Sequence, residues 1–178
     1  MKRKSTEEIL MESFLELAEK KSVEKISTKE IANNCGYSTA TFYRHYSDKY
    51  DLIARCYTEQ MGEIMKGFDK DDFSWEDAYF ASTEYYLDNR QYLANLFRHT
   101  SGLDSFVRNM TEINCRVYEQ YLQNHFPNWR LDEKTKMKIR LFCHGASRLV
   151  SEWILDNNPI SSKEMAEILM ESFPIELP

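Results

Sequence analysis

Small side chains that carry hydroxyl or methyl groups occupy four consecutive positions of the sequence, Ser38, Thr39, Ala40 and Thr41. Hydroxyl groups can hydrogen-bond to either kind of base edge, and the methyl groups of Thr and Ala can pack against the methyl group of thymine. A helix that enters the major groove of DNA by its N-terminal end needs small groups there, so that its backbone and hydroxyls reach the bases. If a helix begins here, its first turn has the chemistry of base recognition.

Groups that suit phosphate oxygens lie in the same stretch. Tyr43, His45 and Lys49 supply a phenol, an imidazole and an ammonium near the same rim. Thr28 and Lys29 add a hydroxyl and a cation at a second helix start, where the helix dipole also favours an anion. We predict that these five residues hold phosphates. Taken singly, Tyr43 could instead pack against the following helix, and His45 could be a solvated histidine.

Two short helices joined by a tight turn must position these side chains. The run Ser27-Thr28-Lys29-Glu30 is a capping box, which marks a helix start, and Gly36 follows as a left-handed stop. Ser38 then caps a third helix that continues to about Tyr46. The inner face of the pair is formed by Ile31, Phe42 and Tyr46. This pattern predicts a helix-turn-helix, although most small three-helix units do not bind DNA.

Helix signals continue along the rest of the chain. Ser5-Thr6-Glu7-Glu8 opens a first helix, and Ser47-Asp48 caps a fourth over about 48–66. Further helices are expected at about 75–88, 90–99, 103–125, 133–157 and 162–173, with breaks at Gly102, Pro127-Asn128 and Asn157-Asn158-Pro159. We predict an all-α fold of nine helices: a DNA-binding head over 1–50, linked through helix 48–66 to a body over 51–178.

The charge balance differs between these two parts. Residues 1–60 carry 10 Lys and Arg against 10 Asp and Glu, whereas residues 61–178 carry 13 against 19. If nucleic acid is bound, the head therefore binds it and the acidic body stays away. The chain has no apolar run of membrane-spanning length and no secretory signal at its start, so we expect it to be cytoplasmic. Its four scattered cysteines are expected to be reduced thiols.

The sequence does not favour an enzyme. Cys143 and His144 are adjacent in an expected helix, so they point about 100° apart and cannot act as nucleophile and base. We find no Gly-rich phosphate loop, no Ser-His-Asp spacing and no cluster of metal ligands. We therefore expect neither a cofactor nor a metal. A dimeric interaction protein that has lost DNA binding would lack the contact residues of the head, which are present here.

The run from Ser27 to Leu52, with its Cys-Gly-Tyr-Ser, Thr-Phe-Tyr-Arg-His-Tyr and Asp-Lys-Tyr-Asp-Leu segments, resembles the DNA-binding head of the TetR family of bacterial transcription regulators. The resemblance covers roughly residues 5–55. It implies a nine-helix TetR-like architecture and a homodimer on a near-palindromic operator, usually as a repressor. It also implies base contacts near Thr39, Ala40 and Thr41 and phosphate contacts near Thr28, Tyr43, His45 and Lys49. Ala40 departs from the Gly of many members, which would alter base preference.

The resemblance further implies a body that dimerises and encloses an effector. The expected helix 133–157 is apolar on more than one stripe, so it can serve the core and a partner at once. With the last helix it could form a four-helix bundle across a two-fold axis, or both helices could simply cap the monomer. The predicted interface comprises Met137, Leu141, Gly145, Arg148, Leu149, Trp153, Met165, Ile168 and Leu169. The predicted effector pocket comprises Tyr85, Tyr86, Phe97, Phe106, Met110, Tyr118 and Phe142.

The segment from Tyr85 to Tyr121 is similar to the body of a Firmicutes-type subgroup of the family, which includes relatives of the dihydroxyacetone-kinase regulator. Members of that subgroup answer to a protein partner. The effector could therefore be a small molecule or a protein. The chain is accordingly expected to be a repressor released by an effector or, alternatively, an activator or co-regulator under a protein partner.

Overall fold

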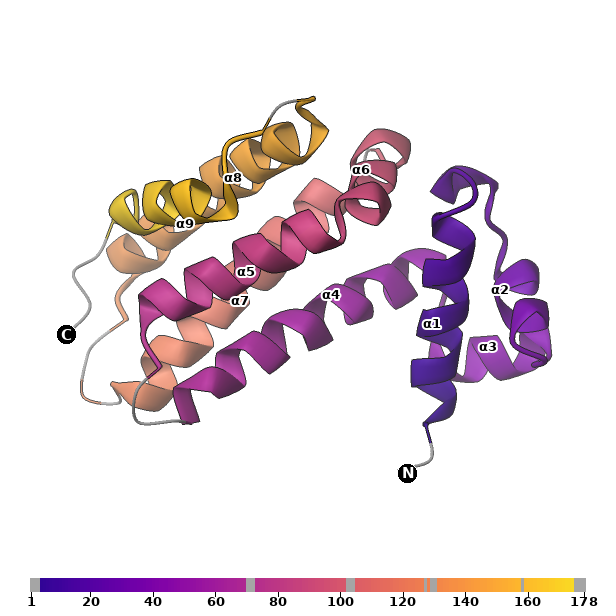
Figure 1. Cartoon of the computed structure of the whole chain (residues 1–178). Helices are drawn as coiled ribbons and strands as arrows, with labels where there is room; N and C mark the ends of the chain where they lie inside the picture. Colours follow the sequence, from indigo (N-terminus) through magenta and orange to yellow (C-terminus); the bar gives the residue numbers. More distant parts are fainter. Residues whose placement is uncertain are drawn as a thin grey trace.

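The computed structural model describes residues 4–69, 73–101, 105–126, 128, 131–157 and 159–174. In these ranges the chain forms nine α-helices and two 3-10 turns but no strand (Figure 1), which confirms the predicted all-α class. The helices are α1 (Thr6–Ala18), α2 (Thr28–Asn34), α3 (Thr39–His45), α4 (Lys49–Met65), α5 (Trp75–Asp88), α6 (Arg90–His99), α7 (Phe106–His125), α8 (Glu133–Leu155) and α9 (Ser162–Glu171). The turns are η1 (Val23–Lys25) and η2 (Lys66–Asp69).

Side-chain caps explain where many of these helices begin. Four serine caps each accept a hydrogen bond from the backbone N–H three residues on: Ser5, Ser27, Ser74 and Ser161. The acidic side chain at that third position accepts a hydrogen bond from the backbone N–H of the serine. Each such box satisfies two backbone donors that the helix itself leaves unpaired. The predicted boxes at Ser5 and Ser27 are confirmed. Of the predicted breaks, Gly102, Pro127 and Asn158 lie outside the described residues, whereas Asn128, Asn157 and Pro159 are described and belong to no helix.

The helices form a small head and a larger body, which α4 joins. In Figure 1, α1, α2 and α3 lie together at one end, and α4 runs from them along the body. In the body, α5 packs against α9, α7 packs against α8, and α4 lies on α7. Leu52 and Ile53, early in α4, belong to the buried core, and Met61, further along, is buried as well. Because α4 serves both parts, the predicted division at residue 50 stays a prediction.

A buried apolar cluster continues from the head into the body. It includes Leu10 and Phe14 of α1 and reaches Leu93 and Leu96 of α6. The ring of Phe14 meets the edge of Tyr92 at a centroid distance of 6.1 Å. Burial of apolar surface on this scale is the main favourable contribution to folding. None of the described helices is both long enough and apolar enough to cross a membrane.

A polar clasp adds to this contact between head and body. Asn95 of α6 accepts a hydrogen bond from the backbone N–H of Val23 at 3.0 Å. Its amide nitrogen donates to the carbonyl oxygens of Ala18 at 2.7 Å and Lys21 at 2.8 Å. Gln91, one turn earlier in α6, donates to the carbonyl of Glu19. These hydrogen bonds fix the segment between α1 and α2 to α6.

Candidate nucleic-acid interface

The turn between α2 and α3 depends on a glycine. Gly36 has φ +78°, a left-handed conformation that residues with a Cβ atom rarely adopt. The N–H of Tyr37 donates to the carbonyl of Ala32 at 2.9 Å, and that of Gly36 donates to Asn33 at 3.1 Å. These bonds close the end of α2 and turn the chain sharply into α3. The predicted left-handed stop at Gly36 is confirmed.

The inner face of the two helices is buried as predicted. Ile31, Ala32 and Phe42 are fully buried, and Tyr46 is 1% exposed. Phe42 and Tyr46 also contact each other, with ring centroids 5.6 Å apart. Because α3 has 3.6 residues per turn, burial of Phe42 turns the other side of its first turn toward solvent. The chain therefore forms a helix-turn-helix with its second helix presented at the surface.

The first turn of α3 presents small polar groups. Ser38 and Ala40 are exposed, and Thr39 and Thr41 are half-exposed. The hydroxyl oxygen of Ser38 accepts the N–H of Thr41 at 3.1 Å and lies 3.0 Å from the hydroxyl of Thr41. The cap thereby fixes the start of α3 while the hydroxyls remain within reach of a partner. This surface can bond to base edges, as the sequence predicts.

Tyr43 stands at the surface beside the start of α2. Its side chain is 56% exposed, and its hydroxyl lies 3.1 Å from the hydroxyl of Thr28. The ring of Tyr43 also packs in a T-shaped contact with the ring of Phe42, with centroids 5.6 Å apart. Lys29 is exposed next to Thr28. The hydroxyls of Thr28 and Tyr43, two of the predicted phosphate contacts, thus lie together on one surface.

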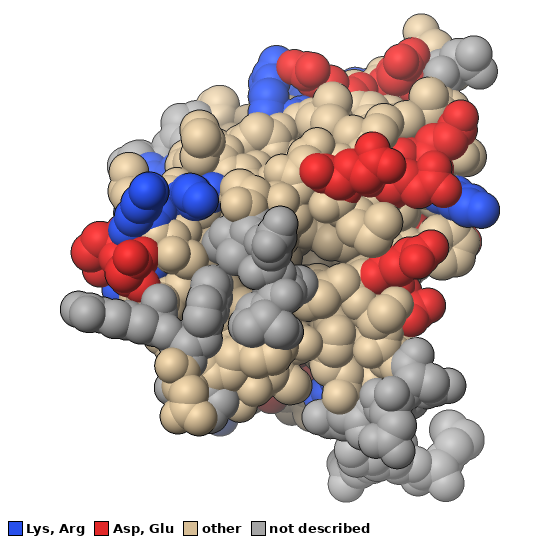
Figure 2. All heavy atoms as spheres, turned by 90° about the vertical axis from the view of Figure 1, so that its left-hand side faces the viewer, with Lys and Arg blue, Asp and Glu red and all other residues tan. Residues whose placement is uncertain are grey.

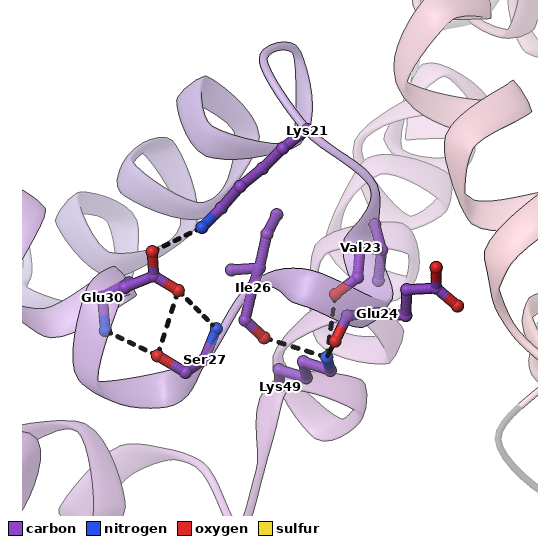
Figure 3. A network of polar contacts seen from close by, with 7 residues as sticks. All are labelled: Lys21, Val23, Glu24, Ile26, Ser27, Glu30 and Lys49. Carbon is purple, nitrogen blue, oxygen red and sulfur yellow. Dashed lines mark hydrogen bonds and ion pairs between the residues drawn. The ribbon is translucent and has the colours of Figure 1, made fainter.

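Lys49 has a different environment from the one that the sequence predicts (Figure 3). Its ammonium donates to the carbonyl oxygens of Val23 at 2.8 Å, Glu24 at 3.1 Å and Ile26 at 2.9 Å. An ammonium has three N–H donors, so these carbonyls use all of them. Burial also lowers its pKa. We therefore revise the predicted phosphate contact: Lys49 fixes η1 and the approach to α2 against the start of α4.

Two neighbouring residues complete the rim of α3. His45 is half-buried, and its Nδ1 atom lies 3.3 Å from a carboxylate oxygen of Glu7 in α1. Arg44 is exposed and donates to the hydroxyl of Thr41 at 3.1 Å. Arg44 is not among the residues predicted from the sequence. Its position in the last turn of a short helix whose first turn carries the base-reading groups is the signal that identifies it.

The body is more acidic than the head, since residues 61–178 carry 13 Lys and Arg against 19 Asp and Glu. Figure 2 shows the end of the body away from the head, which carries several groups of acidic side chains and fewer basic ones. Acidic surface repels the DNA backbone. The charge pattern agrees with contact through the head.

The predicted dimer interface divides into an exposed set and a buried set. Met137 and Leu141 of α8 are 62% and 76% exposed, and Leu149 and Ile168 are 39% and 40% exposed. Gly145 and Arg148 are exposed on the same helix. The remaining three, Trp153, Met165 and Leu169, are buried inside the monomer and cannot belong to a free surface. Trp153 also donates its indole N–H to the carbonyl of Ile160. These three residues belong to the apolar stripe of each helix that packs into the monomer core, so we remove them from the predicted interface.

A pocket of about 60 Å³ lies within the body. Of the residues predicted for it, Tyr86, Met110, Tyr118 and Phe142 form its wall. Tyr85, Phe97 and Phe106 do not line it and pack on the main core instead. Tyr85 and Tyr86 are neighbours on α5 and point about 100° apart, so only Tyr86 faces the pocket. The other residues of the wall were not predicted from the sequence; they include Met61 of α4, Trp75 of α5 and Asn114 of α7.

Two models of known protein families match the sequence. The family model described as bacterial regulatory proteins of the tetR family matches residues 10–56. A second model, described as a transcriptional regulator C-terminal region, matches residues 74–174, which is more than half of the chain. The chain belongs to the TetR family. It is a TetR-family transcription regulator, as its head sequence indicated.

Solved structures of other TetR-type regulators share the fold. A TetR transcriptional regulator from Rhodococcus sp. RHA1 aligns with a TM-score of 0.65 and 19% identity, over 92% of this chain and 90% of that one. The dihydroxyacetone kinase operon activator DhaS aligns with a TM-score of 0.61 and 15% identity, over 93% and 92%. A TetR regulator from Streptococcus agalactiae 2603V gives 0.63 and 13%, over 92% and 90%. No curated protein matches the sequence.

These relatives are transcription regulators rather than enzymes, and the TetR-type head contains the surface described above. All four cysteines are free. In the described part of the chain, no group of three or more His, Cys, Asp or Glu side chains could hold a metal ion.

Proposed function

We propose that this regulator binds a near-palindromic DNA operator as a homodimer, represses transcription by blocking a promoter, and is released by an effector bound in its body. The observation that supports this most directly is the exposed first turn of α3, with Tyr43 held beside it by Thr28. A recognition helix of a helix-turn-helix protein contacts base edges through its N-terminal residues. The exposed groups of α3 are of that kind.

In this proposal the head residues divide by their chemistry. Ser38, Thr39, Ala40 and Thr41 contact bases, because their small groups surround the free end of α3. Phosphate contacts come from Thr28 and Lys29 at the start of α2, from Tyr43 beside them, and from Arg44 and His45 in the last turn of α3. Lys49 takes no part in DNA contact. It acts on binding only by holding the turn before α2 in place.

The exposed apolar stripe of α8 and α9 supports the homodimer. Three large apolar side chains of α8 are exposed to water in the monomer, Met137, Leu141 and Leu149, and a partner subunit would cover them. Around them α8 exposes basic side chains, at Lys134, Lys138, Arg140 and Arg148. The exposed face of α9 is mostly acidic, with Glu164, Glu167 and Glu171. A two-fold arrangement that places α8 against α9 of the partner would bring opposite charges together.

Two-fold symmetry sets the geometry on DNA. The recognition helices of such a pair bind half-sites about 34 Å apart, one turn of the double helix. An effector that changes this separation lowers operator affinity by an amount equal to its preference for the unbound arrangement. The body pocket, which α4 helps to line, is the site where we expect it to bind.

Selection of bound fragments from genomic DNA, followed by fluorescence anisotropy on the fragment obtained, tests the proposal. Removal of one phosphate contact by Tyr43→Ala should weaken binding about 10- to 150-fold on every sequence, since a hydrogen bond to a charged group contributes about 1.5–3 kcal/mol. Thr41→Val should instead change which sequence is preferred. Phe80→Ala, on the exposed face of α5, is the control. If Tyr43→Ala left affinity unchanged at several salt concentrations, the assigned phosphate surface would be incorrect.

A second candidate keeps the DNA-binding role and reverses the sign of regulation. The similarity of Tyr85–Tyr121 to the subgroup of the dihydroxyacetone-kinase regulator supports an activator or co-regulator under a protein partner, and the solved structure of DhaS, named an activator, has this fold. Transcription in vitro from the selected promoter separates the two. Repression predicts less transcript with the purified protein alone, and activation predicts more transcript once the partner is present.

A further inference from the structure

The described residues that line the body pocket all have uncharged side chains. Its apolar part comes from residues such as Met61, Met110, Val117 and Leu169, and its polar groups are those of Ser82, Asn114, Cys143, an indole and three tyrosines. No Lys, Arg, Asp, Glu or His belongs to it in the described part of the chain. The pocket therefore offers shape and hydrogen bonds but no counter-ion.

The tyrosines of the wall remain neutral at any physiological pH. Burial raises the pKa of Tyr86 to about 12 and raises the pKa values of Tyr79 and Tyr118 as well. The other influences on these three pKa values come from neighbouring tyrosines, Asn114 and Cys143, all of which are uncharged. An ion placed in this pocket would lose its hydration without gaining a partner of opposite charge.

A hydrogen-bonded group at one side of the pocket can recognise a polar atom. The hydroxyl of Tyr57, from α4, donates to the amide oxygen of Asn114 in α7 at 2.9 Å. It also lies 2.7 Å from the hydroxyl of Tyr86 in α5. Asn114 and Tyr86 line the pocket, whereas Tyr57 stands behind them. A ligand that replaces Tyr57 at the amide oxygen of Asn114 removes one of the bonds that hold α4.

The size of the pocket limits its occupant. At about 60 Å³ it is smaller than the cavity of about 150 Å³ that holds benzene in an engineered protein. Three methionines in the wall, Met61, Met65 and Met110, can adapt, because the unbranched side chain has three rotatable bonds. A compact molecule up to the size of one ring can therefore enter with a modest rearrangement.

From these observations we propose that the body pocket binds a small, uncharged, largely apolar molecule with one hydrogen-bonding group, which Asn114 and Tyr86 recognise. This inference rests on the proposed function in treating the pocket as the effector site. It goes further in naming the chemical class of the ligand. Organic anions and cations of the same shape are excluded, because the pocket supplies no charge to compensate their lost hydration.

A matched series of ring compounds tests the charge selectivity on the full-length protein without DNA. Benzyl alcohol, benzoate, benzylammonium and toluene share one ring and differ at one group. Binding is followed by ligand-observed NMR and calorimetry. We expect saturable binding of benzyl alcohol, binding of toluene about 5-fold weaker from the loss of one hydrogen bond, and binding of both ions at least about 100-fold weaker.

The role of Asn114 is tested by a leucine substitution of similar size. In Asn114→Leu, toluene should bind at least as well as before, and the advantage of benzyl alcohol over toluene should disappear. The matched control is Asn109→Leu, on the same helix and outside the pocket wall. It should keep the wild-type ratio. Since the measured quantity is a ratio of two ligands on one protein, a general loss of stability does not imitate the effect.

Each outcome bears on the proposal. Equal or tighter binding of benzoate or benzylammonium by the wild-type protein would overturn it, because a charge would have to face the pocket. Absence of saturable binding by all four compounds would overturn it as well. Failure of the proposed function looks different: benzyl alcohol would bind as expected, yet the anisotropy assay would show no DNA binding, or no release of DNA by a ligand of this class.

Discussion

Replacement of Asn95 tests the attachment of the head to the body most directly. Its side chain makes three hydrogen bonds to the backbone between α1 and α2: from the N–H of Val23 at 3.0 Å, and to the carbonyls of Ala18 at 2.7 Å and Lys21 at 2.8 Å. Each bond contributes about 1 kcal/mol net, and a buried N–H left without a partner costs about 1–3 kcal/mol. We expect Asn95→Ala to lower the free energy of unfolding by about 2–4 kcal/mol.

Urea denaturation at a fixed protomer concentration measures this loss, since the stability of an oligomer depends on concentration. Asn95→Asp is the sharper variant. It keeps an acceptor for Val23 but turns an oxygen toward two carbonyl oxygens, so it should destabilise at least as much as alanine despite its equal size. The control, Asn124→Ala, changes an exposed asparagine of α7 and should stay within about 0.5 kcal/mol of wild type. The reasoning fails if Asn95→Ala costs no more than this control.

Three further expectations concern other parts of the chain. Lys49→Met should lower the free energy of unfolding by about 2 kcal/mol or more, because charge-assisted hydrogen bonds are lost. The slope of operator affinity against salt concentration, measured by anisotropy, should stay unchanged. A slope smaller by about one ion would mean that Lys49 contacts a phosphate after all. The pKa of Glu30 is lowered to about 2, first by the side chain of Lys21 and then by Ser27, so its stabilising effect is complete above its ordinary pKa and is lost as the pH falls toward 2. The stability difference between wild type and Glu30→Gln in urea should therefore shrink over that range, and an unchanged difference would contradict the assignment. If the chain forms the proposed homodimer, Leu141→Glu should convert it to a monomer in light scattering, and Gln120→Glu, at an exposed position of α7, should not; a Leu141→Glu protein that stays dimeric would exclude the α8 surface.

Much of the head could be predicted from sequence because its determinants are local. The capping boxes at Ser5 and Ser27 and the left-handed Gly36 each act within a few residues, and the structure has all three. The inner face of the helix-turn-helix followed from helical spacing alone. Local rules of this kind need no knowledge of the rest of the fold.

The features that sequence reasoning missed depend on contacts between distant segments. Lys49 has the residue type of a phosphate contact, but its acceptors lie more than twenty positions earlier, in a 3-10 turn. Asn95 carries no local signal, because its partners are backbone groups of another helix pair. In the body, an apolar helical stripe can face the core or a partner, and periodicity does not distinguish Trp153, which is buried, from Leu141, which is exposed.

If the head binds DNA and the pocket binds an effector, as proposed, the way the head is held connects the two sites. One attachment is α4, which begins beside η1 at Lys49, bonds to α5 and α7 through Tyr57, and lines the pocket through Met61. The other is the clasp of Asn95 on α6. If a ligand takes the place of Tyr57 at Asn114, it loosens the first attachment and leaves the second, so the head would turn about α6 instead of detaching. A head that turns about a fixed point changes its distance from its twin, which is the quantity that an operator with fixed half-site spacing senses. Under this reasoning, loss of the clasp should uncouple ligand binding from DNA release even in a variant that remains folded.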